Sequence, residues 1–244
     1  MQEIQTPTAT DNGLPTATPR RNYLMPAAIV ALVLIIDQVI KFWIKLTFAY
    51  HEHRSVFGDW FYLYFIENEG MAFGLSWGGE TGKLLLTLFR LVAVGFIFYW
   101  LKRTIDTKAH VGLVVCIALI LSGALGNIVD SVFYGVIFSE STPTQVASLF
   151  PEGGGYSNWL HGRVVDMFYL PIWEGYLPQW LPFWGGDYFV FFQPIFNVAD
   201  AAISVGIIAI LIFQTVFFKE EKKQPIAEAS ASTTVADSTD ERIS

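Results

Sequence analysis

Four long apolar stretches dominate the pattern of hydrophobic and polar positions along the chain. They cover residues 24–45, 84–101, 111–129 and 195–218, and most polar residues lie between or beyond them. A helix needs about 20 mostly apolar residues to cross the roughly 30 Å of hydrocarbon in a bilayer. The pattern therefore predicts four membrane-spanning helices.

The two longer connections, residues 46–82 and 131–194, are not simple polar linkers. Residues 55–65 are rich in aromatic side chains and partly alternate, which predicts a small β element. Residues 168–194 are rich in Trp, Tyr, Phe and Pro, and aromatic residues favour the boundary between membrane and water. Residues 139–160 contain a Gly-Gly-Gly run and are expected to form a flexible insertion.

Basic residues divide the connections into two classes. They precede the first stretch, separate the second from the third and follow the fourth, whereas the two long connections hold only Arg54 and Arg163, with Lys45 and Lys83 at the edges. Loops rich in Lys and Arg stay in the cytoplasm. We expect an all-α integral membrane protein with four transmembrane helices, both termini cytoplasmic, and a small extracytoplasmic β element with lid-like loops.

Composition supports this fold class. The chain is 53% hydrophobic and only 15% charged, against about 25% charged residues in soluble domains. The net charge of -7 argues against nucleic acid as a partner, since such binders need a basic face. Residues 1–22 and 220–244 are predicted to be disordered cytoplasmic tails around a membrane domain at 23–219.

Polar residues inside the apolar stretches lie near one end of the predicted bundle. Asp37 comes late in the first stretch, Asn127 and Asp130 end the third, and Asn197 and Asp200 begin the fourth. In the predicted topology all five lie at the outer membrane face. Because a charged residue within a span costs about 2.5–3.5 kcal/mol on insertion scales, such residues are candidates for a functional site.

Asp166 joins this group from the second long connection, where apolar residues surround it. Burial raises the pKa of a carboxyl group, and two neighbouring carboxylates tend to share one proton. Such a pair activates water with one member and protonates a carbonyl with the other, as in aspartic proteases. We expect no metal, because the histidines show no ligand spacing. They are His51, His53, His110 and His161.

Five sequence blocks carry a resemblance to a known family. They are DQVIK at 37–41, NEGMAFG at 68–74, GALGNIVD at 123–130, VVDM at 164–167 and FNVADAAISVG at 196–206. In this order and on a four-span topology, the chain resembles the lipoprotein signal peptidases (signal peptidase II), which are membrane aspartic proteases of bacteria.

The resemblance implies a protein of the bacterial cytoplasmic (inner) membrane with its active site at the outer face, and we expect a monomer. Its substrate would be a diacylglyceryl-modified prolipoprotein, held among membrane lipid and cut just before the lipidated cysteine without a cofactor. Asp166 and Asp200 match the catalytic pair. The other matched positions, which bind substrate or support the site, are Asp37, Lys41, Asn68, Gly70, Asn127, Asp130 and Asn197.

The chain also departs from the family pattern. Ser131 stands where the family commonly has Arg directly after the aspartate of the third block, and we hypothesise that Arg163 replaces that charge. The stretches on either side of Asp166 are longer than expected.

Several roles stay open from sequence alone. Asp37 and Lys41 are spaced i,i+4, so a structural ion pair is as reasonable as contact with substrate. Asn127 and Asp130 favour support of a helix end over catalysis. Asn197 alone would be a helix cap.

Three other functions fit intramembrane acids. A proton-coupled carrier would distribute its acids across the membrane depth. A metal-dependent membrane lipid phosphotransferase would need bases for phosphate beside its acids. A membrane assembly protein would use the acids only structurally. The gathering of acids at one face and the scarcity of outer bases favour the protease.

Overall fold

The computed structural model describes residues 22–69, 79–191 and 194–219 of the 244-residue chain. Gly70 and, apart from Asn22, the two predicted tails lie outside these ranges.

Four helices are long and apolar enough to cross a membrane, as predicted. They are α1 (Leu24–Lys45), α2 (Gly79–Asp106), α3 (Val111–Val129) and α5 (Val198–Phe217). The bounds of α1 and α3 coincide with the predicted ones. A π-helical turn, η2 (Asp130–Tyr134), and a short helix, α4 (Gly135–Ile137), extend the third span.

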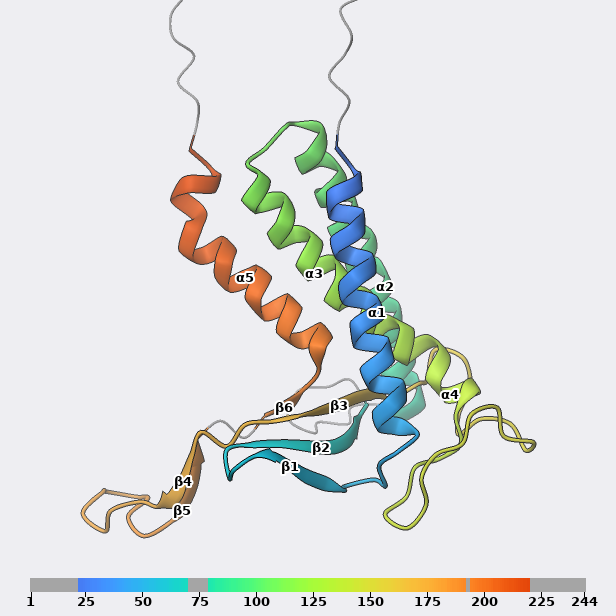
Figure 1. Cartoon of the computed structure of the whole chain (residues 1–244), viewed down its shortest axis with the longest axis vertical. Coiled ribbons are helices and arrows are strands. Elements are labelled where there is room, and N and C mark those ends of the chain that lie inside the picture. The colour runs from blue at the N-terminus through green and yellow to red at the C-terminus, as the bar shows by residue number, and fades with distance from the viewer. Residues whose placement is uncertain (1–21, 70–78, 192–193, 220–244) are drawn as a thin grey trace, which may run out of the picture.

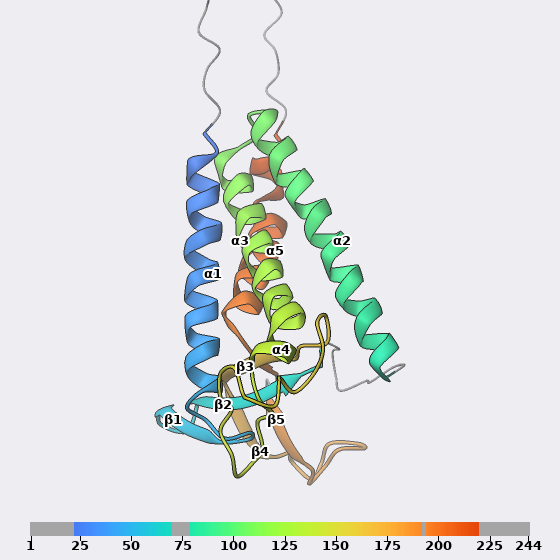
Figure 2. The ribbon, with the colours of Figure 1, turned by 90° about the vertical axis from the view of Figure 1, so that its right-hand side faces the viewer.

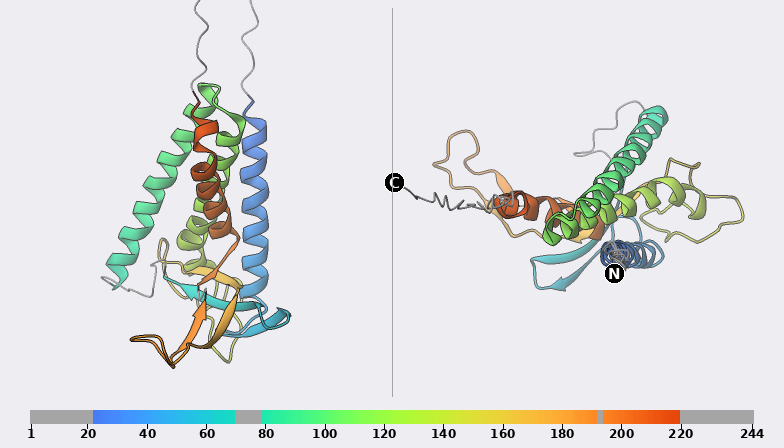
Figure 3. Two further views of the ribbon diagram at one scale, coloured as in Figure 1. Left: turned by 90° about the vertical axis from the view of Figure 1, so that its left-hand side faces the viewer. Right: turned by 90° about the horizontal axis from the view of Figure 1, so that it is seen from above.

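Helix α3 lies at the centre of the bundle and packs against α1, α2 and α5. Figures 2 and 3 show α2 leaning away from the other helices toward one end. The outer helices expose large apolar side chains, such as Ile35 (60% exposed), Phe89 (69%) and Leu211 (61%). Such contiguous apolar exposure suits contact with lipid, and the chain is a multi-pass membrane protein.

The classification as all-α is wrong, because the long connections build more β structure than predicted. Four strands form an antiparallel sheet in the order β1-β2-β3-β6. They are β1 (His53–Phe57), β2 (Phe61–Asn68), β3 (Val164–Tyr169) and β6 (Ile195–Phe196). A separate hairpin pairs β4 (Trp173–Tyr176) with β5 (Tyr188–Phe191). Only the β1–β2 region was predicted, at 55–65.

The sheet closes one end of the bundle. Buried Phe65, Val165 and Met167 of the sheet pack with Ile44 at the end of α1 and with Tyr134 of η2. This burial of apolar strand faces explains why these segments form strands rather than loops. The sheet lies below the helices in Figure 1, β4 and β5 project to one side, and both described chain ends leave at the opposite end.

Residues 139–160, expected to form a flexible insertion, have a defined path beside the end of the third span. They fold back on α4 through backbone hydrogen bonds, including Tyr156 N to Phe138 O at 2.9 Å and Ser157 N to Gly135 O at 2.8 Å. The buried Lys45 ammonium donates to Ser141 Oγ at 3.0 Å and pairs with Glu67.

Candidate active site

The start of α5 fixes the position of Asp200. Asn197 is the helix N-cap: its Oδ1 accepts from Asp200 N at 2.9 Å, and Asp200 Oδ2 accepts from Asn197 N at 3.4 Å. This reciprocal arrangement is a capping box, which satisfies backbone donors that a helix end leaves unpaired. Ile195 and Phe196, predicted to start the helix, instead form β6. Both roles considered for Asn197 and Asp200, cap and site, are therefore compatible.

Strand β3 positions Asp166, which we had expected on a loop. The side chain is 2% exposed. Its Oδ1 accepts from Asn197 Nδ2 at 2.6 Å and its Oδ2 accepts from Asn68 Nδ2 at 3.4 Å. Asn197 thus binds Asp166 through its side chain and Asp200 through its backbone N–H. One residue therefore contacts both carboxylates.

Burial and, after it, the negative charge of Asp200 together raise the pKa of Asp166 to about 7. The Lys41 charge and the hydrogen bonds from Asn197 and Asn68 act in the opposite direction. Asp166 therefore keeps a proton over part of the neutral range, as a general acid requires.

Asn127 connects this pair to α1. Its Nδ2 donates to Asp200 Oδ1 at 2.8 Å, while its Oδ1 accepts from Lys41 Nζ at 2.9 Å and from Asn197 Nδ2 at 3.2 Å. Support of a helix end, the role favoured for Asn127 over catalysis, does not describe the whole of its contacts, because its side chain also contacts Asp200 directly.

Lys41 lies between two buried carboxylates. Its Nζ is 2.9 Å from Asp37 Oδ2 and 2.7 Å from Asp130 Oδ2, and all three side chains are at most 1% exposed. The same carboxylates accept backbone donors, Ala199 N at 2.9 Å for Asp37 and Val165 N at 3.2 Å for Asp130. The cluster ties α1, η2, α5 and β3 together.

Gly126 permits this close packing. A Cβ at Gly126 would lie 2.6 Å from Asp37 Oδ2 and 3.1 Å from the Cβ of Ala199. Gly126 in the third block therefore has a steric reason, because α1 and α5 approach α3 closely beside the carboxylates.

Comparison with known proteins assigns the family. The family model described as signal peptidase (SPase) II matches residues 29–217. The chain belongs to the signal peptidase II family. A lipoprotein signal peptidase of Porphyromonas gingivalis is 52% identical over 187 residues, which are 76% of this chain and 80% of the relative. One from Amoebophilus asiaticus is 35% identical over 213 residues, 86% and 84% of the two chains. A solved bacterial membrane enzyme has a TM-score of 0.51 at 25% identity and covers 82% of this chain and 94% of its own.

All the predicted site residues of this signal peptidase II that the structure describes come together in one network. Gln38 was missed as a site residue, although it lies in the first block. Its Nε2 donates to Asp37 Oδ2 at 3.1 Å and to Asp130 Oδ1 at 3.0 Å. A polar amide directly after Asp37 in an otherwise apolar helix was the signal that could have found it.

Arg90 was not predicted as a site residue, and the hypothesis that Arg163 replaces the charge at residue 131 stays a prediction. Arg163 Nη1 lies 2.8 Å from Glu140 Oε1 and 3.3 Å from Glu67 Oε2, so its charge pairs with these two glutamates. Arg90 Nη1 instead donates to Ser131 Oγ at 2.9 Å. A lone base in an apolar stretch was the available signal.

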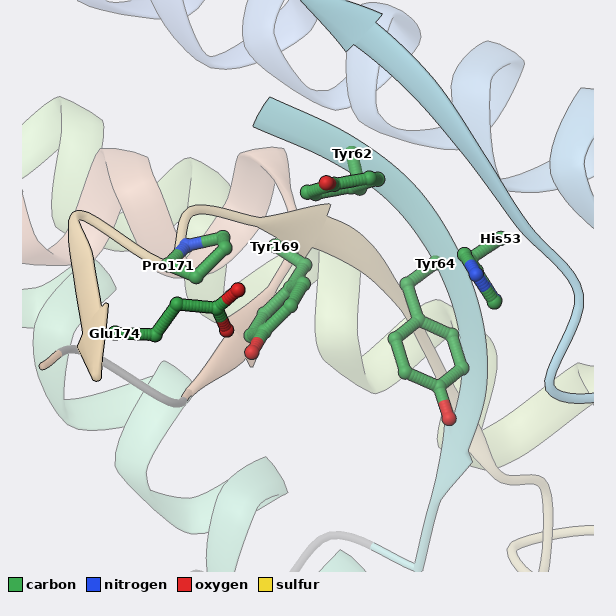
Figure 4. A pocket seen from close by; sticks show the side chains of 6 residues that line it. All are labelled: His53, Tyr62, Tyr64, Tyr169, Pro171 and Glu174. Carbon is green, nitrogen blue, oxygen red and sulfur yellow. The ribbon is translucent and has the colours of Figure 1, made fainter. Parts of the chain in front are cut away.

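Metal-ligand groups and an aromatic pocket are the other features to compare with the site in the part of the chain that the structure describes. Within residues 22–69, 79–191 and 194–219, His, Cys, Asp and Glu form no group of three or more that could hold a metal ion. The pocket in Figure 4 contains none of the predicted site residues. It is lined by His53, Tyr62, Tyr64, Tyr169, Pro171 and Glu174.

Proposed function

We propose that Asp166 and Asp200 are the catalytic pair with which this signal peptidase II cuts diacylglyceryl-modified prolipoproteins just before the lipidated cysteine. The observation that carries the proposal is Asn197, which binds both carboxylates in a buried network. The names of the relatives, lipoprotein signal peptidase, support the substrate class. All these catalytic groups come from one chain, so a monomer suffices.

The surroundings suggest different roles for the two carboxylates. Asp200 lies in the first turn of α5 and accepts a hydrogen bond from Asn127, and a helix N-terminus stabilises negative charge. We therefore assign Asp200 as the general base. Asp166, whose pKa is raised to about 7, is the general acid.

Cleavage then proceeds in two proton-balanced steps. Asp200 removes a proton from water, the oxygen attacks the scissile carbonyl, and Asp166 protonates the carbonyl oxygen to give a gem-diol. Asp200 next returns its proton to the amide nitrogen while Asp166 takes a hydroxyl proton. The C–N bond breaks, releasing a carboxylic acid and the amine of the lipidated cysteine, and the pair regains its starting state.

The site lies at the sheet end of the bundle, and the basic α2–α3 connection lies at the other end. We place the basic end in the cytoplasm and the catalytic pair at the outer face of the bacterial inner membrane. Diacylglyceryl chains can then stay in lipid while the peptide bond meets water. The β4–β5 hairpin and its connection expose Trp180, Phe183 and Trp184, and we place this aromatic arm at the membrane surface.

Reconstituted cleavage tests the proposed substrate and chemistry together. Purified protein in liposomes receives a prolipoprotein with or without its diacylglyceryl group, each in the presence and absence of a strong chelator. We expect cleavage of the modified substrate only, with no effect of the chelator. Loss of activity with the chelator would favour metal chemistry, and equal cleavage of both substrates would contradict the proposed specificity.

A further inference from the structure

The aromatic pocket lies on the face of the sheet that is turned away from the helices. His53 of β1 lies opposite Tyr64 of β2. Tyr62 of β2 lies opposite Tyr169 of β3, and opposed residues project to the same face of a sheet. Leu63, between the two tyrosines of β2, packs against the core that the sheet shares with α1 and η2. Because successive side chains of a strand alternate between faces, the row of rings lies on the opposite face.

The rings surround a small space. The ring centroid of Tyr169 is 6.1 Å from those of Tyr62 and Tyr64, at interplanar angles of 38° and 80°. The ring of His53 lies 5.5 Å from that of Tyr64. The pocket beside these rings has a volume of about 220 Å³, which is below the roughly 300–1,000 Å³ of pockets that hold a whole small molecule. It therefore suits a single side chain or functional group.

The pocket is also negatively charged. Figure 4 shows the carboxylate of Glu174, from β4, pointing toward Tyr169. Burial and the negative charge of Glu174 raise the pKa of Tyr169. Burial and the charges of Asp59 and Glu174 raise the pKa of Tyr62. Two of the rings thus lie within the field of carboxylates, which favours a cation in the space between them.

The protein itself supplies no such cation from the described residues that line the pocket, because none of them is Lys or Arg. Arg54, next to His53 in β1, makes its contacts elsewhere. It pairs with Glu52 at 2.6 Å and lies over the ring of Phe48, 4.1 Å from the centroid. An ammonium group is attracted to the face of an aromatic ring, and a carboxylate adds an ion pair. The pocket is therefore complementary to an alkylammonium group from another molecule.

We propose that the aromatic pocket binds a lysine side chain of the prolipoprotein, in the part of its chain that follows the lipidated cysteine. This inference rests on the proposed function. In the proposed orientation the outer face of the sheet is the side on which that part of the substrate leaves the membrane. Tyr169 follows Asp166 by three residues in β3, which is about 10 Å along a strand. An extended substrate covers this distance in about three residues, so we expect the lysine about three residues beyond the cysteine or slightly further.

The experiment uses diacylglyceryl-modified substrates that differ only in one residue, lysine or the uncharged norleucine, placed in turn at the positions after the cysteine. The pocket variants are Tyr169→Leu, Tyr169→Phe and Glu174→Gln. The matched control is Asp187→Asn, because Asp187 is exposed on the same hairpin and does not line the pocket. KM and kcat are measured in liposomes, with thermal unfolding as a check of folding. Equilibrium binding of both substrates to Asp200→Asn protein is measured in parallel.

We expect wild type to have a KM about three- to tenfold lower for the lysine substrate at the best position, with the same kcat. Binding that is equal in the ground and transition states changes KM alone. Glu174→Gln and Tyr169→Leu should lose most of this preference. Tyr169→Phe, which keeps the ring, and Asp187→Asn should retain it. All four variants should cleave the norleucine substrate as wild type does.

Equal KM values for the two substrates in wild type would overturn the inference. So would a full lysine preference in Glu174→Gln, or a loss in Asp187→Asn as large as in Glu174→Gln. If Tyr169→Leu does not fold, the comparison of Glu174→Gln with Asp187→Asn decides.

A second arm separates lysine from the ammonium group of a lipid. The measurements are made in liposomes of phosphatidylglycerol, with and without phosphatidylethanolamine. A lysine preference in phosphatidylglycerol alone supports the proposal. Pocket variants that change KM for both substrates equally, and only with phosphatidylethanolamine present, would show a headgroup site and contradict it. If wild type cleaves neither substrate, the proposed function is refuted, and the binding comparison still decides whether the pocket takes lysine.

Discussion

Replacing Asn197 by serine separates the two functions of this buried side chain. Asn197 Oδ1 caps α5 by accepting from Asp200 N at 2.9 Å, and Asn197 Nδ2 donates to Asp166 Oδ1 at 2.6 Å. Serine is about as good an N-cap as asparagine, but it is too short to reach Asp166. Alanine loses both contacts, which makes Asn197→Ala the matched comparison.

The expected magnitudes follow from these contacts. A hydrogen bond to a charged group contributes about 1.5–3 kcal/mol, which corresponds to about one to two pKa units at 1.36 kcal/mol per unit. The bond from Asn197 stabilises ionised Asp166, so its loss raises the pKa of Asp166 above the present value of about 7. Loss of the cap in the alanine variant costs a further 0.5–2 kcal/mol or so of stability.

The assay is the pH dependence of kcat for cleavage in liposomes, together with thermal unfolding. Because Asp166 acts in its protonated form, a higher pKa moves the alkaline limb to higher pH, by about one to two units. Both variants should show this shift, while only Asn197→Ala should lose the stability of the cap. An unchanged alkaline limb in a folded Asn197→Ser protein would refute the assignment of Asp166 as general acid.

Three further predictions concern packing, charge and the membrane. Gly126→Ala should destabilise the protein by about 1–3 kcal/mol, since the added Cβ would crowd Asp37. The control Gly95→Ala should not lower the thermal midpoint, because nothing lies within 4 Å of a Cβ added there. Lys41→Met should lower the free energy of unfolding by about 3–5 kcal/mol, because it leaves two buried carboxylates without their cation. The control Lys102→Met breaks an exposed pair and should lower it by at most about 1 kcal/mol. A large loss in Lys102→Met or none in Lys41→Met would contradict this reading. Brominated lipid should quench the fluorescence of Trp180. The contribution of this residue is the difference in quenching between wild type and Trp180→Phe, and equal quenching of both proteins would contradict contact of the aromatic arm with the membrane.

The spans could be predicted from sequence because lipid imposes a strong length and polarity requirement. This holds best for α1 and α3, whose apolar runs end where the helices end. The prediction is wrong at the start of α5. Ile195 and Phe196 continue the apolar run but form a short strand, so apolarity does not mark where the helix begins. The predicted second span, 84–101, also omits the polar ends of α2, which extends from Gly79 to Asp106.

The sheet was harder to predict than the helices. The alternating run 55–65 revealed one hairpin, but β3 is a short apolar run whose strand character depends on pairing with β2, about 100 residues away. Asp166 was therefore assigned to a loop. Its burial, which raises its pKa, depends on the same long-range packing.

The candidate site could be predicted where its residues stood in compact blocks. The contact between Arg90 and Ser131 could not, because it joins α2 to η2 across 41 residues and no local spacing indicates it. Arg163 was the plausible substitute by position along the chain. Its surroundings, Glu67 and Glu140, become visible only when the sheet and residues 139–160 are folded.

The most direct test of the central claim is cleavage of a diacylglyceryl-modified prolipoprotein by purified Asp166→Asn and Asp200→Asn proteins in liposomes. An asparagine at either position can neither accept nor deliver the required proton, so each variant should be at least about 10²–10⁴-fold slower than wild type. Unfolding measurements should show that both remain folded. Cleavage at the wild-type rate by either folded variant would contradict the account.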